Sequence, residues 1–292
     1  MLKGLNPQQI EAVIEEGNVL LTACPGSGKT RALTYKIAYE LERLTNSKKI
    51  IIAVTFTNRA ADEIKKRIRE LNADDTNLWA GTIHSFCLEW ILRPYMCYLD
   101  EIKNGFSISD EYNSENLMSE LKKTYGLNFW DSVSTKYLPN GEKEEVVYKE
   151  LLDEYHETLA SKKLIDFDQI LHYAHQLILT YPKISEILKN MFHLICVDEY
   201  QDTQQLQYAI LAKIMKGASG DCKMFFVGDS DQAIYGSLGG VAKELEEINN
   251  EFGVVFTGKE LSGNYRSNQQ IIDYYRNFQT TNIDIKALGT NA

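Results

Sequence analysis

The sequence predicts an α/β fold in which a parallel β-sheet is flanked by helices. Short β-branched or apolar runs recur along the chain, and helical spacing of apolar residues follows several of them. Continuous apolar runs are typical of parallel strands buried on both faces, and their alternation with helices is typical of βα units. The predicted strands lie at 18–24, 50–56, 78–83, 192–198, 224–228 and 254–257.

Apolar residues spaced for one helix face predict the helices. The pattern at 60–71 aligns Ile64, Ile68 and Leu71, and similar spacing occupies 31–41 and 204–215. The stretch 99–165 interrupts the βα rhythm, is rich in Glu, Lys, Tyr and Asn, and contains a helical pattern at 144–159 and a turn at 139–141. We expect an inserted, mostly helical subdomain there.

Composition limits the class of protein. The chain has 292 residues, of which 44% are hydrophobic, and this excludes a disordered chain. A net charge of -10 argues against a DNA-packaging protein, so any DNA contact must be local. The five cysteines form no C-x-x-C pair, which favours reduced thiols over disulfides or a zinc site. With no signal peptide or membrane-spanning run, the sequence predicts a cytoplasmic protein without a membrane partner.

The glycine-rich segment 23–30 connects the first predicted strand to the following helix, which is the context of a phosphate-binding loop. Glycines let backbone N–H groups close around phosphate oxygens, Lys29 reaches the β- and γ-phosphates, and Thr30 ligates Mg²⁺. Ala23 stands where the general pattern has its first glycine. The alternative is a glycine-rich turn without a ligand. The loop comprises Ala23, Cys24, Pro25, Gly26, Ser27, Gly28, Lys29 and Thr30.

Two carboxylates end the strand at 192–198. We expect Asp198 to hold Mg²⁺ and Glu199 to deprotonate the attacking water, although acidic residues also simply solvate strand ends. Phosphoryl transfer needs further polar groups at the γ-phosphate. Gln232 and Arg266 are candidates, with an ordinary loop amide and a surface charge as the alternatives.

In chain order, these segments resemble superfamily 1 DNA helicases of the UvrD/PcrA/Rep type. VDEYQDT at 197–203 and NYRS at 264–267, together with GSGKT, are the most specific matches. Segments 5–9, 55–61, 81–86 and 227–235 resemble the Q motif and motifs Ia, Ib and III. The resemblance implies an ATP- and Mg²⁺-dependent motor that moves 3′ to 5′ on single-stranded DNA or acts at DNA ends.

The resemblance also implies a domain plan and further roles. Residues 1–98 and 166–260 would form a first RecA-like P-loop domain, 99–165 the insertion, and 261–292 the start of a truncated second RecA-like domain. Gln9 would read adenine, Tyr265 would stack on the base, Arg266 would act as an arginine finger, and Gln232 would couple the γ-phosphate to DNA. Arg31 would line the pocket, or would be a solvated helix charge.

For DNA, the resemblance implies contacts from motifs Ia, Ib and III, in which aromatic rings stack on bases and polar groups meet phosphates. A core position for Phe56 and a helix-start role for His84 are the alternatives. Ser237 replaces a ring that the family often has, so we expect a weaker hold on DNA. The implied DNA contacts are Phe56, Thr57, Asn58, Thr82, His84 and Tyr235.

Motifs V and VI are absent from the chain, so we expect the 292 residues alone to bind nucleotide and hydrolyse it poorly. A second hypothesis is a nucleotide-responsive UvrD-like subunit of a Gabija-type anti-phage assembly, in which a nuclease or other protein is the partner. A small-molecule kinase is disfavoured because Glu199 beside Asp198 suits water activation.

Overall fold

The computed structural model describes residues 2–44, 48–217, 220–233, 239–281 and 283–289, arranged in two compact units. The predicted insertion at 99–165 lies inside the second unit, and the domain boundaries stay a prediction. The first unit comprises Met1–Ile83, Ser185–Gln204 and Leu211–Ala292, and the second comprises His84–Ile184 and Gln205–Ile210.

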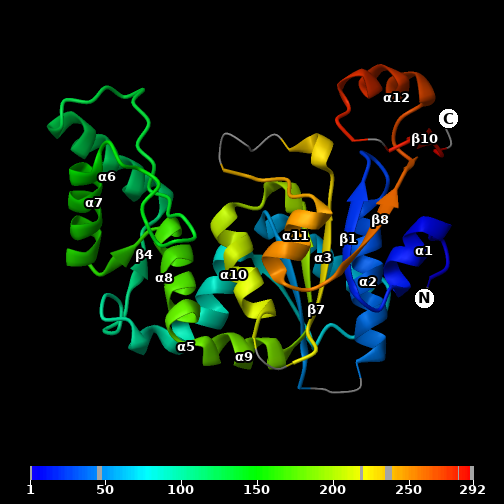
Figure 1. Cartoon of the computed structure of the whole chain (residues 1–292), viewed down its shortest axis with the longest axis horizontal. Helices are drawn as coiled ribbons and strands as arrows, with labels where there is room; N and C mark the ends of the chain where they lie inside the picture. Colours follow the sequence, from blue (N-terminus) through cyan, green and yellow to red (C-terminus); the bar gives the residue numbers. More distant parts are fainter. Residues whose placement is uncertain (1, 45–47, 218–219, 234–238, 282, 290–292) are drawn as a thin grey trace. The chain divides into compact units, whose positions relative to one another are not determined.

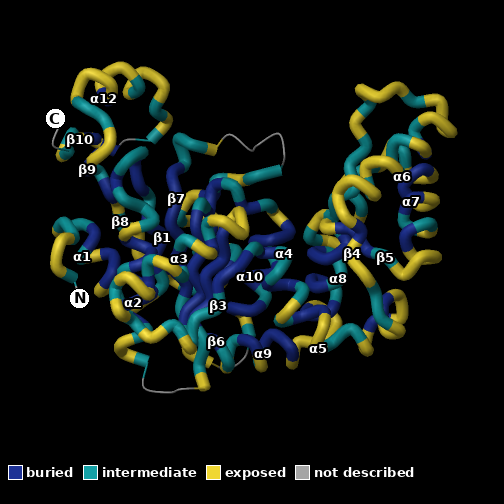
Figure 2. The backbone as a smooth tube through the Cα atoms, turned by 180° about the vertical axis from the view of Figure 1, so that it is seen from behind, coloured by how far each residue is buried: buried dark blue, intermediate teal, exposed yellow. Residues whose placement is uncertain are grey.

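A six-stranded sheet forms the centre of the first unit, with strand order β3-β2-β6-β7-β1-β8. Every neighbouring pair is parallel, which confirms the predicted α/β fold. In Figure 2, β6 and β7 are buried along most of their length, as expected for apolar strands covered on both faces. The strands are β1 (Asn18–Ala23), β2 (Ile50–Thr55), β3 (Leu78–Thr82), β6 (Phe192–Asp198), β7 (Lys223–Gly228) and β8 (Phe256–Leu261).

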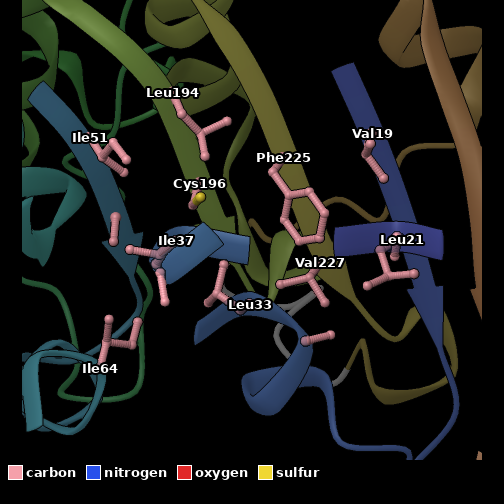
Figure 3. Packing of buried hydrophobic residues seen from close by; sticks show 14 of the residues in the cluster. Val19, Leu21, Leu33, Ile37, Ile51, Ile64, Leu194, Cys196, Phe225 and Val227 are labelled. Carbon is pink, nitrogen blue, oxygen red and sulfur yellow. The ribbon is translucent and has the colours of Figure 1, made fainter. Parts of the chain in front are cut away.

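Three helices pack on one face of this sheet: α1 (Pro7–Ile14), α2 (Lys29–Arg43) and α3 (Asn58–Glu70). Leu33 and Ile37 of α2 meet Cys196 and Val227 of the strands in one apolar core (Figure 3). On the opposite face, Phe226 packs against the phenyl ring of Phe252 from α11 (Leu245–Phe252), with ring centroids 5.4 Å apart. Both faces therefore bury apolar surface, the main stabilising contribution.

The last predicted strand begins and ends later than expected. The pattern indicated 254–257, whereas β8 spans Phe256–Leu261. Gly253 ends α11 in a left-handed conformation, and Val255 stays 81% exposed. The rest of β8 is polar because it is an edge strand that pairs only with β1. An edge strand needs no continuous apolar run, so its signal was weak.

The second unit is mostly helical (Figure 1). Its main helices are α6 (Glu111–Thr124), α7 (Lys149–Ser161) and α8 (Phe167–Thr180), and a short parallel pair joins β4 (Ser107–Ile108) to β5 (Leu164–Ile165). The predicted turn at 139–141 is present, closed by a hydrogen bond from the Gly141 N–H to the Leu138 carbonyl (2.9 Å). The helix predicted from 144 starts at Lys149, since the Glu145 carboxylate accepts the Val147 N–H (2.8 Å) in a local turn.

The described residues contain no helix long and apolar enough to cross a membrane. All five cysteines are free thiols; Cys97 is exposed and the other four are buried.

The remaining elements are α4 (Ile83–Phe86), the π-helix η1 (Cys87–Leu92), α5 (Arg93–Tyr95), η2 (Met96–Tyr98), α9 (Pro182–Met191), η3 (Tyr200–Asp202), α10 (Gln205–Met215), η4 (Ser230–Gln232), β9 (Gly263–Asn264), α12 (Gln269–Tyr275), η6 (Arg276–Phe278) and β10 (Lys286–Ala287).

Candidate nucleotide site

The glycine-rich loop joins β1 to α2, and two of its glycines are required by the backbone. Gly26 and Gly28 have φ angles of 72° and 84°, a region that disfavours other residues. A Cβ atom on Gly26 would lie 2.7 Å from Cβ of Arg266, and one on Gly28 would lie 2.7 Å from Nε2 of Gln9. The loop is therefore closely enclosed by two distant segments of the chain.

Lys29, the first residue of α2, brings the predicted phosphate-site residues together. Its Nζ atom lies 3.0 Å from Oε2 of Glu199, 3.4 Å from Oε1 of Gln232 and 3.9 Å from Oδ2 of Asp229. These three residues follow the carboxyl ends of β6 and β7, which are neighbours in the sheet. The arrangement matches the rule that open α/β sheets bind ligands at the carboxyl ends of their strands.

The environment around Lys29 disfavours the charged forms of two aspartates, Asp198 and Asp229. Burial, reinforced by the negative charge of Glu199, raises the pKa of Asp198 to about 7. Burial also raises the pKa of Asp229 to about 6, with Lys29 opposing the shift and Asp231 adding to it. Within the described part of the chain, Oδ2 of Asp229 has no hydrogen-bond donor. This cluster carries more negative charge than one lysine neutralises, so a cation would stabilise it.

Glu199 itself has a strained backbone. Its φ of 51° lies in the left-handed region, which costs a residue with a side chain of order 1–3 kcal/mol. This conformation turns the chain sharply after Asp198 and starts η3. Strain of this kind concentrates at functional sites. The turn directs the Glu199 carboxylate to Lys29, while Asp198 stays 9% exposed at the strand end.

Gln9 is fixed by two different contacts. Its side chain and that of Asn6 form a capping box at the start of α1, and its Nε2 donates to the Ser27 carbonyl (3.0 Å). Nδ2 of Asn6 in turn donates to the Tyr265 hydroxyl (2.8 Å). The capping box fits the helix-start alternative for Gln9, while the Ser27 contact places the amide against the glycine-rich loop. Reading of adenine stays a prediction.

Asn264 organises the segment that contains Tyr265 and Arg266. Its Oδ1 accepts the N–H groups of Arg266 and Ser267, both at 2.8 Å, and the Tyr265 N–H donates to the Gly26 carbonyl (2.9 Å). Asn264 is buried, whereas Tyr265 and Arg266 are exposed. This segment is therefore attached to the phosphate-binding loop through its backbone and leaves both predicted side chains accessible.

The other loop residues differ in environment. Cys24 is buried, and burial raises the pKa of its thiol to about 11. Pro25 and Thr30 are partly exposed, and the Thr30 carbonyl accepts the Thr34 hydroxyl (2.9 Å) as α2 begins. Arg31 is exposed, with its guanidinium carbon 5.7 Å from the Tyr35 ring centroid. Arg31 thus resembles the solvated alternative, and its pocket role stays a prediction.

Four predicted DNA contacts lie in the first unit, at the carboxyl ends of β2 and β3. Phe56 follows β2 and is 54% exposed, which argues against the core alternative. Thr57 is the N-cap of α3 and accepts the Ala60 N–H (3.1 Å), and Asn58 begins the helix. Thr82 ends β3, paired in register with Thr55 of β2. These residues therefore share one edge of the sheet.

The two other DNA candidates are placed differently. His84 belongs to the second unit, where its ring meets Phe167 edge-on with centroids 5.4 Å apart. Burial lowers the pKa of His84, against the opposing charge of Asp168. Tyr235, like Ser237, lies outside the described residues.

Sequence reasoning missed three side chains at this site. Asp229 faces Lys29, Asn264 holds the backbone of Arg266, and the Gln201 amide contacts Glu199. Each belongs to a segment whose resemblance to the family was recognised, so the signal was present. Their contacts depend on which strands are neighbours, and that order is not visible in a single sequence.

The chain matches the family described as UvrD/REP helicase N-terminal domain, over residues 5–136 and 130–253. It is 31% identical to the ATP-dependent DNA helicase UvrD1 of Mycobacterium tuberculosis, over 93% of this chain and 38% of that protein. It is 33% identical to DNA helicase II of Salmonella typhimurium, over 93% and 40% of the two chains. PcrA of Staphylococcus aureus is 30% identical, over 99% of this chain and 42% of that helicase.

The chain thus spans about two fifths of the length of these curated relatives. Among solved structures, it is similar to a crystal structure of the DUF1998 helicase MrfA bound to DNA, with a TM-score of 0.41 and 11% identity, over 88% of this chain and 27% of that one. The parallel sheet is consistent with the RecA-like fold that the resemblance implied. Because the family model matches most of its length, the chain belongs to the UvrD/REP helicase N-terminal domain family.

Proposed function

We propose that this chain carries the ATP site of an ATP-driven DNA helicase motor. The observation that carries the proposal is the meeting of Lys29 with Glu199 and Gln232 at the carboxyl ends of two adjacent strands. A lysine after a glycine-rich loop suits phosphate, and a neighbouring carboxylate suits activation of water. Membership of the helicase family, and relatives named as ATP-dependent DNA helicases, support the same activity.

In this proposal, each residue has one task. The loop N–H groups and Lys29 bind the β- and γ-phosphates, Glu199 takes the proton of the attacking water, and Gln232 and Arg266 stabilise charge on the γ-phosphate. Gln9 and Tyr265 hold the base. The Lys29–Glu199 ion pair must open when phosphate arrives, which frees the carboxylate to act as a base.

The donor set suits Mg²⁺. Thr30 and Asp198 supply hard oxygen atoms beside the loop, and the buried Oδ2 of Asp229 accepts no hydrogen bond from the described residues. Among the described residues, no three His, Cys, Asp or Glu side chains gather to hold a metal alone. Mg²⁺ commonly takes one or two protein carboxylates and completes its shell with phosphate and water. When bound, it would neutralise charge on the phosphates.

We further propose single-stranded DNA as the partner, lying along the edge formed by Phe56, Thr57, Asn58 and Thr82. The exposed Phe56 ring offers a surface for base stacking. The 3′-to-5′ direction and a cytoplasmic location stay predictions. The anti-phage subunit with a nuclease partner is not favoured, since the relatives are named as DNA helicases.

Glu199→Gln tests the proposed chemistry in the full-length protein. The wild type should hydrolyse ATP faster when single-stranded DNA is added. The variant should bind ATP at least as tightly as wild type, because Lys29 no longer pairs with a carboxylate. It should lose about 10²–10⁴-fold in kcat, because the amide cannot take a proton. Glu16→Gln is the matched control, since the Glu16 side chain is 76% exposed. Wild-type rates from Glu199→Gln would refute the general-base role, and phosphate transfer to an acceptor other than water would favour a kinase.

A further inference from the structure

We infer that Gln201 is a positioning residue that holds the Glu199 carboxylate and ties it to the loop carrying Asp229 and Gln232. The inference rests on the proposed function, because it concerns the group that activates water. Gln201 is 2% exposed within η3, so its amide is shielded from solvent by the protein itself. A buried amide must satisfy its hydrogen-bonding atoms internally.

Both ends of the Gln201 amide contact the site. Its Nε2 donates to Oε2 of Glu199 (2.9 Å), and its Oε1 accepts the Asp229 N–H (2.9 Å). A carboxylate only accepts and a backbone N–H only donates, so the orientation of the amide is fixed by its two partners. One side chain thereby connects the residue after β6 with the residue after β7.

The backbone around Gln201 is shaped for this contact. A Cβ atom on Gly228, the last residue of β7, would collide with Oε1 of Gln201 and lie 2.6 Å from the Tyr200 ring. Glycine at 228 therefore allows the amide to reach the next N–H. The Tyr200 hydroxyl also lies 3.0 Å from Oγ of Ser230, which gives the two loops a second connection.

The Gln201 contact matters most after nucleotide binds. Oε2 of Glu199 is shared by Lys29 (3.0 Å) and Gln201 (2.9 Å). Phosphate would draw Lys29 away, and of the two partners described for this carboxylate Gln201 would remain. The Gln201 N–H group then keeps the Glu199 carboxylate directed at the water. The contact with the Asp229 N–H fixes the position of the Gln201 amide relative to the loop that contains Gln232. A shift of about 1 Å in a reacting group can cost about 100-fold in rate.

Gln201→Glu and Gln201→Met provide the test in the full-length protein. At pH 8 the new carboxylate of Gln201→Glu repels Glu199 and donates nothing. When protonated, its O–H donates to Glu199 and its carbonyl accepts the Asp229 N–H, as the amide does. The kcat of this variant relative to wild type should therefore rise as pH falls from 8 to 6. Gln201→Met restores neither contact and should stay about 10- to 100-fold slower throughout.

Affinity for a slowly hydrolysed ATP analogue should stay within about threefold of wild type for both variants, because Lys29 and the loop are intact. Gln205→Glu, at an exposed position, is the matched control and should behave as wild type. Wild-type kcat for Gln201→Met, or a flat relative pH profile for Gln201→Glu, would overturn the inference. An equal loss of analogue binding and kcat would also overturn the inference, because it would indicate that Gln201 only supports the structure of the site. A wild type that hydrolyses no ATP would instead refute the proposed function.

Discussion

Two lysines on helix α2 make opposite kinds of ionic site. Lys36 is fully buried and donates to the Val13 and Glu15 carbonyls (3.2 and 2.6 Å) and to Glu40 (2.6 Å). Lys29 is partly exposed, and its three polar neighbours lie at 3.0–3.9 Å. The first lysine uses all of its donors in short contacts within the fold, whereas the second is held by longer contacts.

The acidic residues record the same difference. Burial alone would raise the pKa of Glu40, but the hydrogen bond from His193 and the charge of Lys36 outweigh it and lower the pKa to about 2. Around Lys29, burial dominates and raises the pKa of Asp198 to about 7. Where a buried carboxylate has enough donors and cations, as at Glu40, its charged form is favoured and stabilises the fold. Where it has too few, as at Asp198, the charged form is disfavoured and a bound cation would stabilise it.

Removing Glu40 should give the largest effect of the comparison. Glu40→Ala leaves the Lys36 charge buried without its carboxylate, so the free energy of unfolding should fall by about 3–5 kcal/mol. Denaturant unfolding measures this change. Glu16→Ala, which removes an exposed partner of Arg43, should cost at most about 1 kcal/mol. A loss below about 1 kcal/mol in Glu40→Ala would show that the cluster contributes little.

The low pKa of Glu40 also gives a pH dependence. Its folded pKa of about 2 lies below the ordinary value of 4.5, so its contribution is present above about pH 4.5 and is lost as pH falls toward 2. The acid-induced loss of stability over this range should therefore be smaller in Glu40→Gln than in wild type.

Replacing Lys29 should affect nucleotide binding more than it affects stability. Lys29→Ala should weaken binding of an ATP analogue by at least about 100-fold, since a cation facing phosphate in a partly buried site is lost. Its free energy of unfolding should fall by less than that of Glu40→Ala, because Asp198 and Asp229 have raised pKa values and can take up protons when the lysine is lost. Equilibrium binding and denaturant unfolding measure the two quantities, with the exposed Lys66→Ala as control. Tight binding by Lys29→Ala would remove the phosphate role from this lysine.

The smallest effect should be a gain of stability. At pH 8, the free energy of unfolding of the nucleotide-free Asp198→Asn variant should exceed that of wild type by about 1–3 kcal/mol. The folded pKa of Asp198, about 7, exceeds the ordinary 3.8, so its ionisation costs stability as pH rises through this range. The gain should vanish near pH 4. Asp62→Asn, at an exposed position, should show no such pH-dependent gain; loss of stability in Asp198→Asn would contradict the contrast between the clusters.

The sequence predicted most of the sheet and the candidate residues Glu199 and Gln232 that the structure places beside Lys29, because both leave local patterns. Apolar runs mark the buried strands, and the glycine spacing before Lys29 marks the loop. The predicted start of the edge strand β8 was two residues too early. Because β8 pairs on one side only, it tolerates polar side chains and leaves a weak apolar pattern. The role of Gln201 was missed because its second partner, Asp229, is distant in sequence and adjacent only through the parallel pairing of β6 and β7.

The uneven burial of the five thiols supplies a chemical handle on the molecule. Thiol reagents attack the thiolate, which burial suppresses at Cys24 by raising its pKa to about 11. Cys97 is exposed, so a maleimide dye should couple there and leave the phosphate-binding loop unmodified. Cys97 belongs to the second unit and the loop to the first. Energy transfer between a fluorescent nucleotide and a dye on Cys97 would thus report the separation of the two units in solution, with the native cysteines left in place.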